Sequence, residues 1–272
     1  MDRQQLITSI RKKESFLCVG LDPDLSKIPP HLLSYDHPIE VFCRAIIEAT
    51  QDLCIAYKPN IAFFEAMGKE GWAALTTVSD YLPKETLKIA DAKRGDIGTT
   101  ATQYAKAFFE ALPYDAITLN AYMGSDAILP FLAYRQKWAI ILGLTSNDSS
   151  KDFQLLTSEG TPLYRHTIEK AMTWGSKENT MFVVGATQPE GLRDVRNFCP
   201  EHFLLIPGVG AQGGNLAEVY HAASNKDVGI IVNVTRDIIY ASSGNDFAEK
   251  ARERALYYQQ EMASLMRDSP QI

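Results

Sequence analysis

Residues 87–112 read LKIADAKRGDIGTTATQYAKAFFEAL, which is a short apolar run, a charged turn and then a segment of helical length. The run at residues 87–91 has the length of a strand, and residues 99–112 have the apolar spacing of an amphipathic helix. Most such runs are apolar throughout rather than alternating, which is typical of strands buried on both faces of a parallel sheet. Two more apolar runs of strand length precede this one and five follow it, at residues 16–22, 55–58, 116–120, 139–145, 181–185, 203–208 and 230–235.

Amphipathic segments of helical length lie between these runs. Strands that alternate with helices indicate right-handed βαβ units, and eight such units predict an α/β fold, a single (β/α)8 TIM barrel. The alternative is an open, doubly wound sheet. Besides residues 99–112, the helical segments are 40–50, 125–135, 162–174 and 247–266, with an extra N-terminal helix at about residues 2–13 before the first strand.

The chain is expected to form one domain over residues 1–272, because no linker rich in Pro, Gly or Ser divides it. The longest connection, residues 146–179, has room for a helix and an active-site loop. The composition of the whole chain, with 46% hydrophobic and 22% charged residues, is ordinary for a folded globular protein. It excludes a disordered or collagen-like chain.

Charge and cysteine usage narrow the class of protein. The net charge of −6 argues against a general binder of nucleic acid or membrane surfaces. The apolar runs are too short to cross a bilayer, and the first residues lack the pattern of a secretory signal. The four cysteines form no CxxC pair and have no zinc-type spacing. Cys18 and Cys54 lie inside apolar runs, so we expect buried, reduced thiols there and a cytoplasmic protein.

Ionisable residues follow several of the predicted strands. In a barrel of this type the carboxyl ends of the strands meet at one mouth, where the chemistry of the fold collects. Solvated loop charges or structural ion pairs explain any one of these residues, but the whole set favours a functional site. The residues placed in this way are Asp22, Lys58, Asp91, Lys93, Asp96 and Arg236.

The densest cluster is Asp91-x-Lys93-x-x-Asp96. Asp91 and Lys93 are two positions apart, so they share one side of an extended strand end. A lysine held between carboxylates stays protonated and could deliver a proton to carbon. A carboxylate fixed near an anionic group of the substrate would instead repel that group.

A glycine-rich turn, PGVGAQGGN at residues 207–215, follows the seventh strand. Glycines between a strand and a helix let backbone N–H groups approach a phosphate, although a plain βα turn fits the same letters. The loops after strands seven and eight often form the phosphate site of such barrels. With the Gln212 amide and the forked Arg236 guanidinium as donors, the sequence predicts a phosphate monoester ligand.

Four elements together resemble the orotidine 5′-phosphate decarboxylase family, in its longer bacterial variety. They are AYKPN at residues 56–60, DAKRGDIGTT at 91–100, PGVGAQGG at 207–214 and the late Arg236. The resemblance covers essentially the whole chain. It implies a carboxy-lyase of pyrimidine biosynthesis that converts orotidine monophosphate to UMP and CO2 without a cofactor or metal. It also implies a homodimer with sites at the subunit interface.

The resemblance assigns catalytic roles by position. Lys93 would protonate the carbon that loses CO2, and Asp91 would face the substrate carboxylate. Lys58 would contact the ribose and the charge network. Asp96 and Thr100 would reach into the site of the partner subunit.

The resemblance also assigns substrate contacts. Asp22 would bind a ribose hydroxyl. The pyrimidine edge would be read by Thr145, with Ser146 as the alternative. The phosphate would be held by Gln212, Gly213, Gly214 and Arg236.

Two other functions remain open. A metal-dependent sugar-phosphate lyase or aldolase of the same barrel group has the same DxKxxD core, although Lys58, the RGDIG continuation and the Gln212 loop favour the decarboxylase. A non-catalytic nucleotide-binding barrel is the other, but a mere binder gains little from carboxylates beside an anionic ligand. A non-covalent complex with the preceding phosphoribosyltransferase is also compatible with the sequence.

Overall fold

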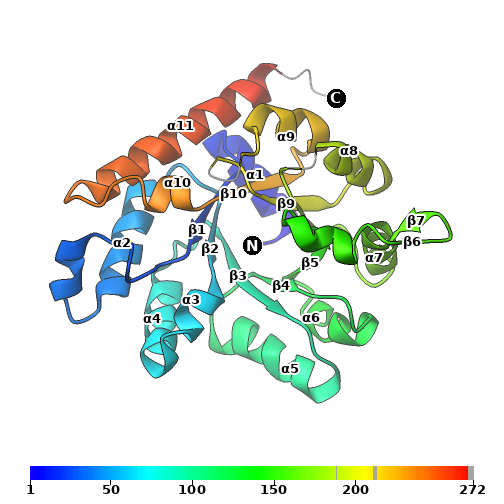
Figure 1. Cartoon of the computed structure of the whole chain (residues 1–272), viewed down its shortest axis with the longest axis horizontal. Helices are drawn as coiled ribbons and strands as arrows, with labels where there is room; N and C mark the ends of the chain where they lie inside the picture. The colour runs from blue at the N-terminus through cyan, green and yellow to red at the C-terminus, as the bar shows by residue number, and fades with distance from the viewer. Residues whose placement is uncertain (188, 211–212, 269–272) are drawn as a thin grey trace.

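The computed structural model describes residues 1–187, 189–210 and 213–268 of the chain. Within these residues eight parallel strands close into a barrel, in the order β1-β10-β9-β8-β5-β4-β3-β2 (Figure 1). This confirms the (β/α)8 barrel and excludes the open sheet. The strands are β1 Leu17–Leu21, β2 Ala56–Pro59, β3 Leu87–Arg94, β4 Ala116–Leu119, β5 Trp138–Leu144, β8 Thr180–Val184, β9 Phe203–Pro207 and β10 Ile230–Val234.

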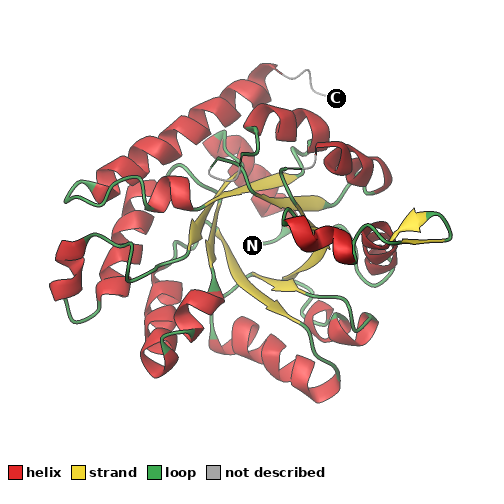
Figure 2. Cartoon of the chain, in the orientation of Figure 1, coloured by secondary structure: helices red, strands yellow, loops and turns green. Residues whose placement is uncertain are grey.

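Helices surround the strands on the outside of the barrel (Figure 2). Their apolar faces pack on strands that are buried along almost their whole length, which is the usual core of this fold. The helices are α1 Arg3–Lys13, α2 Pro38–Thr50, α3 Ile61–Glu65, α4 Gly68–Tyr81, α5 Gly98–Lys106, α6 Leu129–Leu132, α7 Leu163–Met172, α8 Pro189–Phe198, α9 Leu216–Ala223, α10 Arg236–Ile239 and α11 Phe247–Asp268.

Two predicted helices differ from the observed ones. The segment predicted at 99–112 is split into α5 and a π-helical turn, Ala107–Ala111. The segment predicted at 125–135 contains only a 3-10 turn, Ser125–Ala127, and the short α6. Pro130 lacks a backbone N–H, so it fits only the first turn of a helix and separates the two pieces.

The extra helix α1 closes the amino-terminal end of the barrel. The Arg3 guanidinium donates to the carbonyl oxygens of Lys177 and Glu201 at 3.0 and 2.8 Å and pairs with Asp227 at 3.0 Å. These three partners precede β8, β9 and β10, so they lie where those strands begin. In Figure 1 α1 lies behind the strands, and the opposite mouth faces the viewer.

The long connection between β5 and β8 contains α7, which confirms the helix expected there. It contains a 3-10 turn, Asp148–Asp152, and a hairpin of β6 Thr157–Ser158 and β7 Thr161–Pro162. The four cysteines are free and buried, which confirms the burial predicted for Cys18 and Cys54. No helix in the described part of the chain is long and apolar enough to cross a membrane.

Candidate active site

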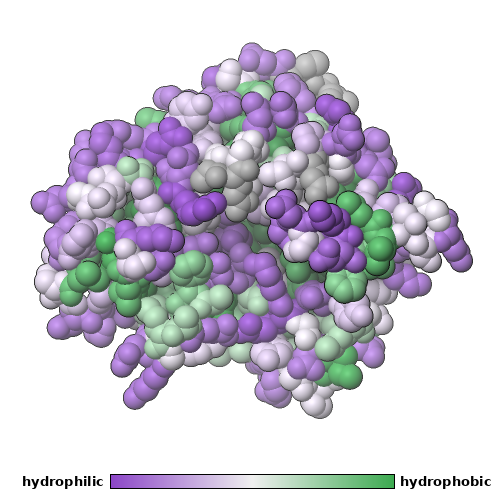
Figure 3. Space-filling model, viewed as in Figure 1, coloured by the Kyte–Doolittle hydropathy of each residue, from purple (hydrophilic) through white to green (hydrophobic). Residues whose placement is uncertain are grey.

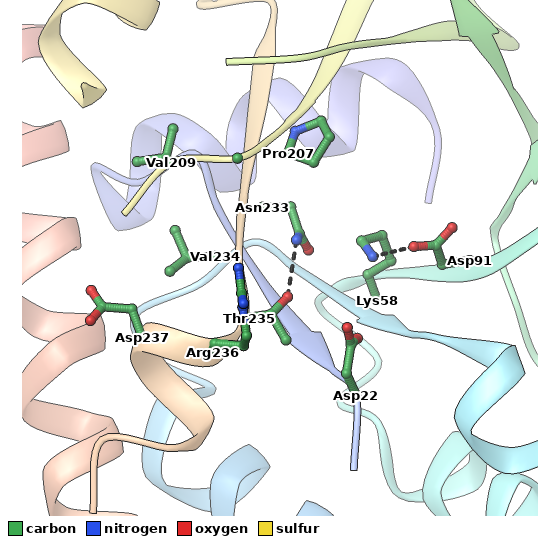
Figure 4. Close-up of a pocket in the computed structure, with 11 residues that line it drawn as sticks. Asp22, Lys58, Asp91, Pro207, Val209, Asn233, Val234, Thr235, Arg236 and Asp237 are labelled. Carbon is green, nitrogen blue, oxygen red and sulfur yellow. Dashed lines mark hydrogen bonds and ion pairs between the residues drawn. The ribbon is translucent and has the colours of Figure 1, made fainter. Parts of the chain in front are cut away.

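A cavity of about 180 Å³ opens at the carboxyl-terminal mouth of the barrel. In Figure 3 this face is hollowed near its centre and hydrophilic residues surround the hollow. The cavity brings together four of the predicted residues from four strand ends. Its lining is Asp22, Lys58, Asp91, Pro207, Gly208, Val209, Asn233, Val234, Thr235, Arg236 and Asp237 (Figure 4).

Asp91 is held between two ammonium groups. The Lys58 Nζ donates to Asp91 Oδ2 at 2.5 Å, and the Lys93 Nζ donates to Asp91 Oδ1 at 2.5 Å. Lys58 from β2 and Asp91 from β3 are buried, whereas the Lys93 side chain is 52% exposed. Lys58 is therefore fixed in the barrel wall. Lys93 is not among the residues that line the cavity, and its ammonium group is joined to the cavity through Asp91.

Neighbouring charges determine the protonation states of Lys58 and Asp91. Burial disfavours the ammonium form of Lys58, but Asp91 and then Asp22 outweigh it and raise the Lys58 pKa. Burial likewise disfavours the Asp91 carboxylate, but Lys58 and Lys93 hold its pKa well below the usual range. Lys58 is therefore cationic and Asp91 anionic at neutral pH.

Asp22 presents a carboxylate oxygen with no protein partner among the described residues. Its Oδ1 is buried and unpaired, while Oδ2 accepts from the Asn60 Nδ2 at 3.4 Å. Burial raises the Asp22 pKa, and Lys58 opposes that rise. A buried oxygen without a partner is costly, so a hydroxyl group of a bound ligand would relieve that cost.

Sequence reasoning missed Asn233 and Thr235 in the cavity wall. The Cys18 thiol donates to Asn233 Oδ1 at 3.5 Å, and the Asn233 Nδ2 donates to Thr235 Oγ1 at 3.1 Å. A Cβ at Gly20 would lie 1.9 Å from Thr235 Oγ1, so only glycine lets Thr235 pack on β1. A polar asparagine inside the apolar run at residues 230–235 is the signal that could have indicated the site.

The glycine-rich turn after β9 borders the cavity beside Arg236. Gly208 and Val209 line the cavity, and Arg236 begins α10 with an exposed side chain. The Gly213 N–H donates to Gly210 O at 2.8 Å, and the Gly214 N–H donates to Gly208 O at 3.0 Å. A phosphate contact through these two N–H groups would therefore require the turn to rearrange. Gln212 lies outside the described residues.

The long helix α11 supports this turn from behind. Asp237 accepts from the Tyr258 hydroxyl at 2.5 Å and pairs with Arg254. A Cβ at Gly210 would meet the same hydroxyl at 2.4 Å, and Gly210 has a φ of +79°. The turn thus approaches α11 at a position where a side chain would not fit.

Asp96 and Thr100 are not in the cavity of their own chain. The Asp96 carboxylate accepts from the Ile97 N–H at 2.8 Å, and Thr100 is exposed on α5. Both lie beyond the end of β3, on the outward side of the mouth, and neither lines the cavity.

Thr145 is also not among the residues that line the cavity. Its N–H donates to Gln154 Oε1 at 2.8 Å, and its hydroxyl accepts from the Gln154 Nε2 at 2.7 Å. Ser146 packs against Gly185, where a Cβ would lie 2.7 Å from the serine Cβ. The loop after β5 is thus bonded to itself, with Gln154 holding Thr145.

Comparisons with known proteins show which proteins this chain is similar to. A family model described as "Orotidine 5'-phosphate decarboxylase / HUMPS family" matches residues 15–252. A curated relative from Flavobacterium johnsoniae, named orotidine 5'-phosphate decarboxylase, is 54% identical and the match covers 98% of each chain.

Two solved structures from Leishmania donovani share the fold. That of its OMP decarboxylase has a TM-score of 0.86 at 36% identity, and the match covers 99% of this chain and 100% of that one. That of its UMP synthase has a TM-score of 0.82 at 39% identity, and the match covers 95% of this chain but only 57% of that one.

Proposed function

Because this chain belongs to the orotidine 5′-phosphate decarboxylase / HUMPS family, we propose that it converts orotidine 5′-monophosphate to UMP and CO2 in pyrimidine biosynthesis. The observation that carries the proposal is Asp91 held between Lys58 and Lys93 at the mouth of the barrel. The name of the relative with 54% identity supports the decarboxylase over the sugar-phosphate alternative.

The proposed chemistry is the replacement of a carboxylate by a proton on one ring carbon. When CO2 leaves, the electron pair of the broken bond stays on an sp² carbon with no obvious π delocalisation. The barrier must therefore be lowered by charges that are in place beforehand. The Lys93 ammonium lies where this negative charge develops, and it then transfers a proton to the carbon.

Asp91 and Lys58 prepare the site for that step. The Asp91 carboxylate faces the carboxylate of the substrate and disfavours it relative to the transition state. Lys58 is buried against Asp91 Oδ2, so it keeps Asp91 ionised and fixed in position. The unpaired Asp22 oxygen accepts a hydrogen bond from a ribose hydroxyl.

Arg236 and the turn after β9 hold the phosphate at the other side of the cavity (Figure 4). We infer that Gln212, Gly213 and Gly214 complete this contact, and that Thr145 or Ser146 reads the pyrimidine edge. These contacts are remote from the bond that breaks, so their binding energy serves to hold the substrate in position against Lys93 and Asp91.

Arg236→Ala is expected to raise KM for orotidine monophosphate by about 10- to 100-fold, the worth of a hydrogen-bonded contact to a charged group. Steady-state kinetics measures this effect. The matched control is Arg135→Ala, an exposed arginine before β5 at the opposite end of the barrel. An unchanged KM in Arg236→Ala, or an equal rise in the control, would remove Arg236 from the phosphate site.

The proposed enzyme is a homodimer in which Asp96 and Thr100 reach the partner's site. Both residues lie outside the cavity of their own chain, which supports this role. Exposed apolar side chains lie in the connections after β3 and β4, close in the sequence to Asp96 and Thr100, and they would suit a protein interface. They are Ile97 (53% exposed), Tyr122 (85%), Met123 (57%) and Leu129 (45%). Pyrimidine-pathway chemistry and four free buried thiols support a cytoplasmic location.

Mixing inactive Lys93→Ala and Asp96→Ala subunits is expected to restore about a quarter of the wild-type activity, because half of the reassorted dimers have one intact site. The intact site combines Lys93 of one subunit with Asp96 of the other. The activity is measured after the two variants are dissociated and reassociated together. No recovery, together with a monomeric mass by sedimentation, would contradict the shared site.

The function itself is tested by following the ultraviolet absorbance of orotidine monophosphate with the wild-type protein in EDTA. We expect conversion to UMP at the same rate with and without the chelator. Cleavage of a keto-hexulose phosphate only when Mg²⁺ is added would favour the metal-dependent relative. Tight UMP binding without any CO2 release would favour the nucleotide-binding barrel.

A further inference from the structure

The pairing of β3 with β4 is irregular where Asp91 and Lys93 leave the barrel wall. Ala90 pairs with Ile117, and Arg94 pairs with Leu119, so residues 91–93 lie opposite a single residue of β4. That residue is Thr118. Extra residues of this kind bend a strand and re-aim its side chains, and they are common next to active sites.

Lys93 has a backbone conformation that needs support. Its φ is +47°, in the left-handed region that residues with a Cβ rarely adopt. Such a conformation persists only where the surroundings determine it. The support is direct, because the Lys93 N–H donates to Thr118 Oγ1 at 2.9 Å.

The same hydroxyl group also holds Asp91. Thr118 Oγ1 donates to Asp91 Oδ1 at 3.0 Å, and this oxygen is the one that accepts from the Lys93 Nζ. A hydroxyl has one donor and two acceptor lone pairs, so both bonds are satisfied together. Thr118 is 1% exposed, so water does not compete for either bond.

We propose that Thr118 is a positioning residue for the reaction: its hydroxyl fixes the main chain of Lys93 against the carboxylate that its ammonium contacts. The inference rests on the proposed roles of Lys93 and Asp91. Thr118 is buried and does not line the cavity, so the proposal gives it no contact with the substrate. Its loss therefore affects the chemical step and leaves the binding of UMP unchanged.

The test compares Thr118→Val, which keeps the shape but removes the hydroxyl, with Thr118→Ser, which keeps the hydroxyl. We expect Thr118→Val to lower kcat by about 10- to 100-fold, since small misplacements of a reacting group cost about this much. KM for orotidine monophosphate and Kd for UMP are expected to stay within about threefold, and Thr118→Ser to recover most of kcat. Thr180→Val is the matched control, a buried threonine at the start of β8.

A wild-type kcat in Thr118→Val would overturn the proposal. Equal losses of kcat in Thr118→Val and Thr180→Val would also overturn it, because they indicate a general cost of losing a buried hydroxyl. If Thr118→Val does not fold, amide hydrogen exchange of the wild type decides. A Lys93 amide that exchanges as slowly as its barrel neighbours supports the bond to Thr118, and an unprotected amide overturns it. Failure of the decarboxylase function is a separate result, in which the wild type leaves orotidine monophosphate unchanged.

Discussion

Lys93→Ala is expected to lower kcat by about 10⁴-fold or more, because it removes both the cation that stabilises the developing carbanion and the proton donor. The Lys93 side chain is 52% exposed, so its removal leaves no buried gap and the fold is retained. Single-turnover kinetics at saturating orotidine monophosphate measures the loss. UMP affinity and thermal unfolding are measured on the same sample.

Lys88→Ala is the control for that loss. Lys88 lies near the amino end of the same strand, where it pairs with Tyr57 of β2. It is not among the residues that line the cavity. Its replacement is expected to change kcat by no more than about twofold, as for a charge away from the site. A Lys93→Ala enzyme that keeps most of its kcat, or a Lys88→Ala enzyme that loses as much, would contradict the assignment.

Asp91→Asn is expected to lower both activity and stability. Its kcat is expected to fall by about 10³-fold, since the fixed charge that faces the substrate is gone. Unfolding in urea at neutral pH is expected to become easier by up to about 3–5 kcal/mol, because the buried Lys58 loses its anionic partner. Asp52→Asn is the matched control, because the Asp52 pair with Arg252 is exposed and is worth at most about 1 kcal/mol.

The folding stability of the wild type at acid pH is expected to depend on the same charge of Asp91. The folded-state pKa of Asp91 is held low by Lys58 and Lys93, so the unfolded state takes up its proton first as the pH falls. The stabilisation is therefore present above the ordinary carboxyl pKa of about 4 and is lost below it. Asp91→Asn is expected to show a flatter fall in stability over this acid range. An equal dependence of stability on pH in the wild type and in Asp91→Asn would contradict the role given to the Asp91 charge.

The sequence predicts most of the fold because continuous apolar runs are the mark of strands buried on both faces. Each of the eight runs overlaps one strand of the barrel. The predicted mouth also follows from the fold, since Asp22, Lys58 and Asp91 come from three separate strands and meet in one cavity. The family resemblance drawn from four motifs is confirmed by the match over residues 15–252. One domain over residues 1–272 stays a prediction.

The features that the sequence could not predict depend on contacts between distant residues. The bulge of β3 depends on how β3 pairs with β4, and nothing in the sequence of residues 91–93 shows that they lie opposite Thr118. The close contact of Gly20 with Thr235 likewise joins the two ends of the chain. The role of Thr145 rests on the resemblance, and nothing in the spacing of the sequence indicates its hydrogen bonds to Gln154.

The central claim is that the Lys93 ammonium, held at Asp91, drives the loss of CO2 without a metal. The most direct measurement is the release of labelled CO2 from carboxyl-labelled orotidine monophosphate in EDTA, by wild type and by Lys93→Ala, in a single turnover. We expect complete release by the wild type and none above background by Lys93→Ala, with equal affinity of both proteins for UMP. Release by Lys93→Ala at the wild-type rate, or a wild type that is inactive until a divalent metal is added, would contradict the claim.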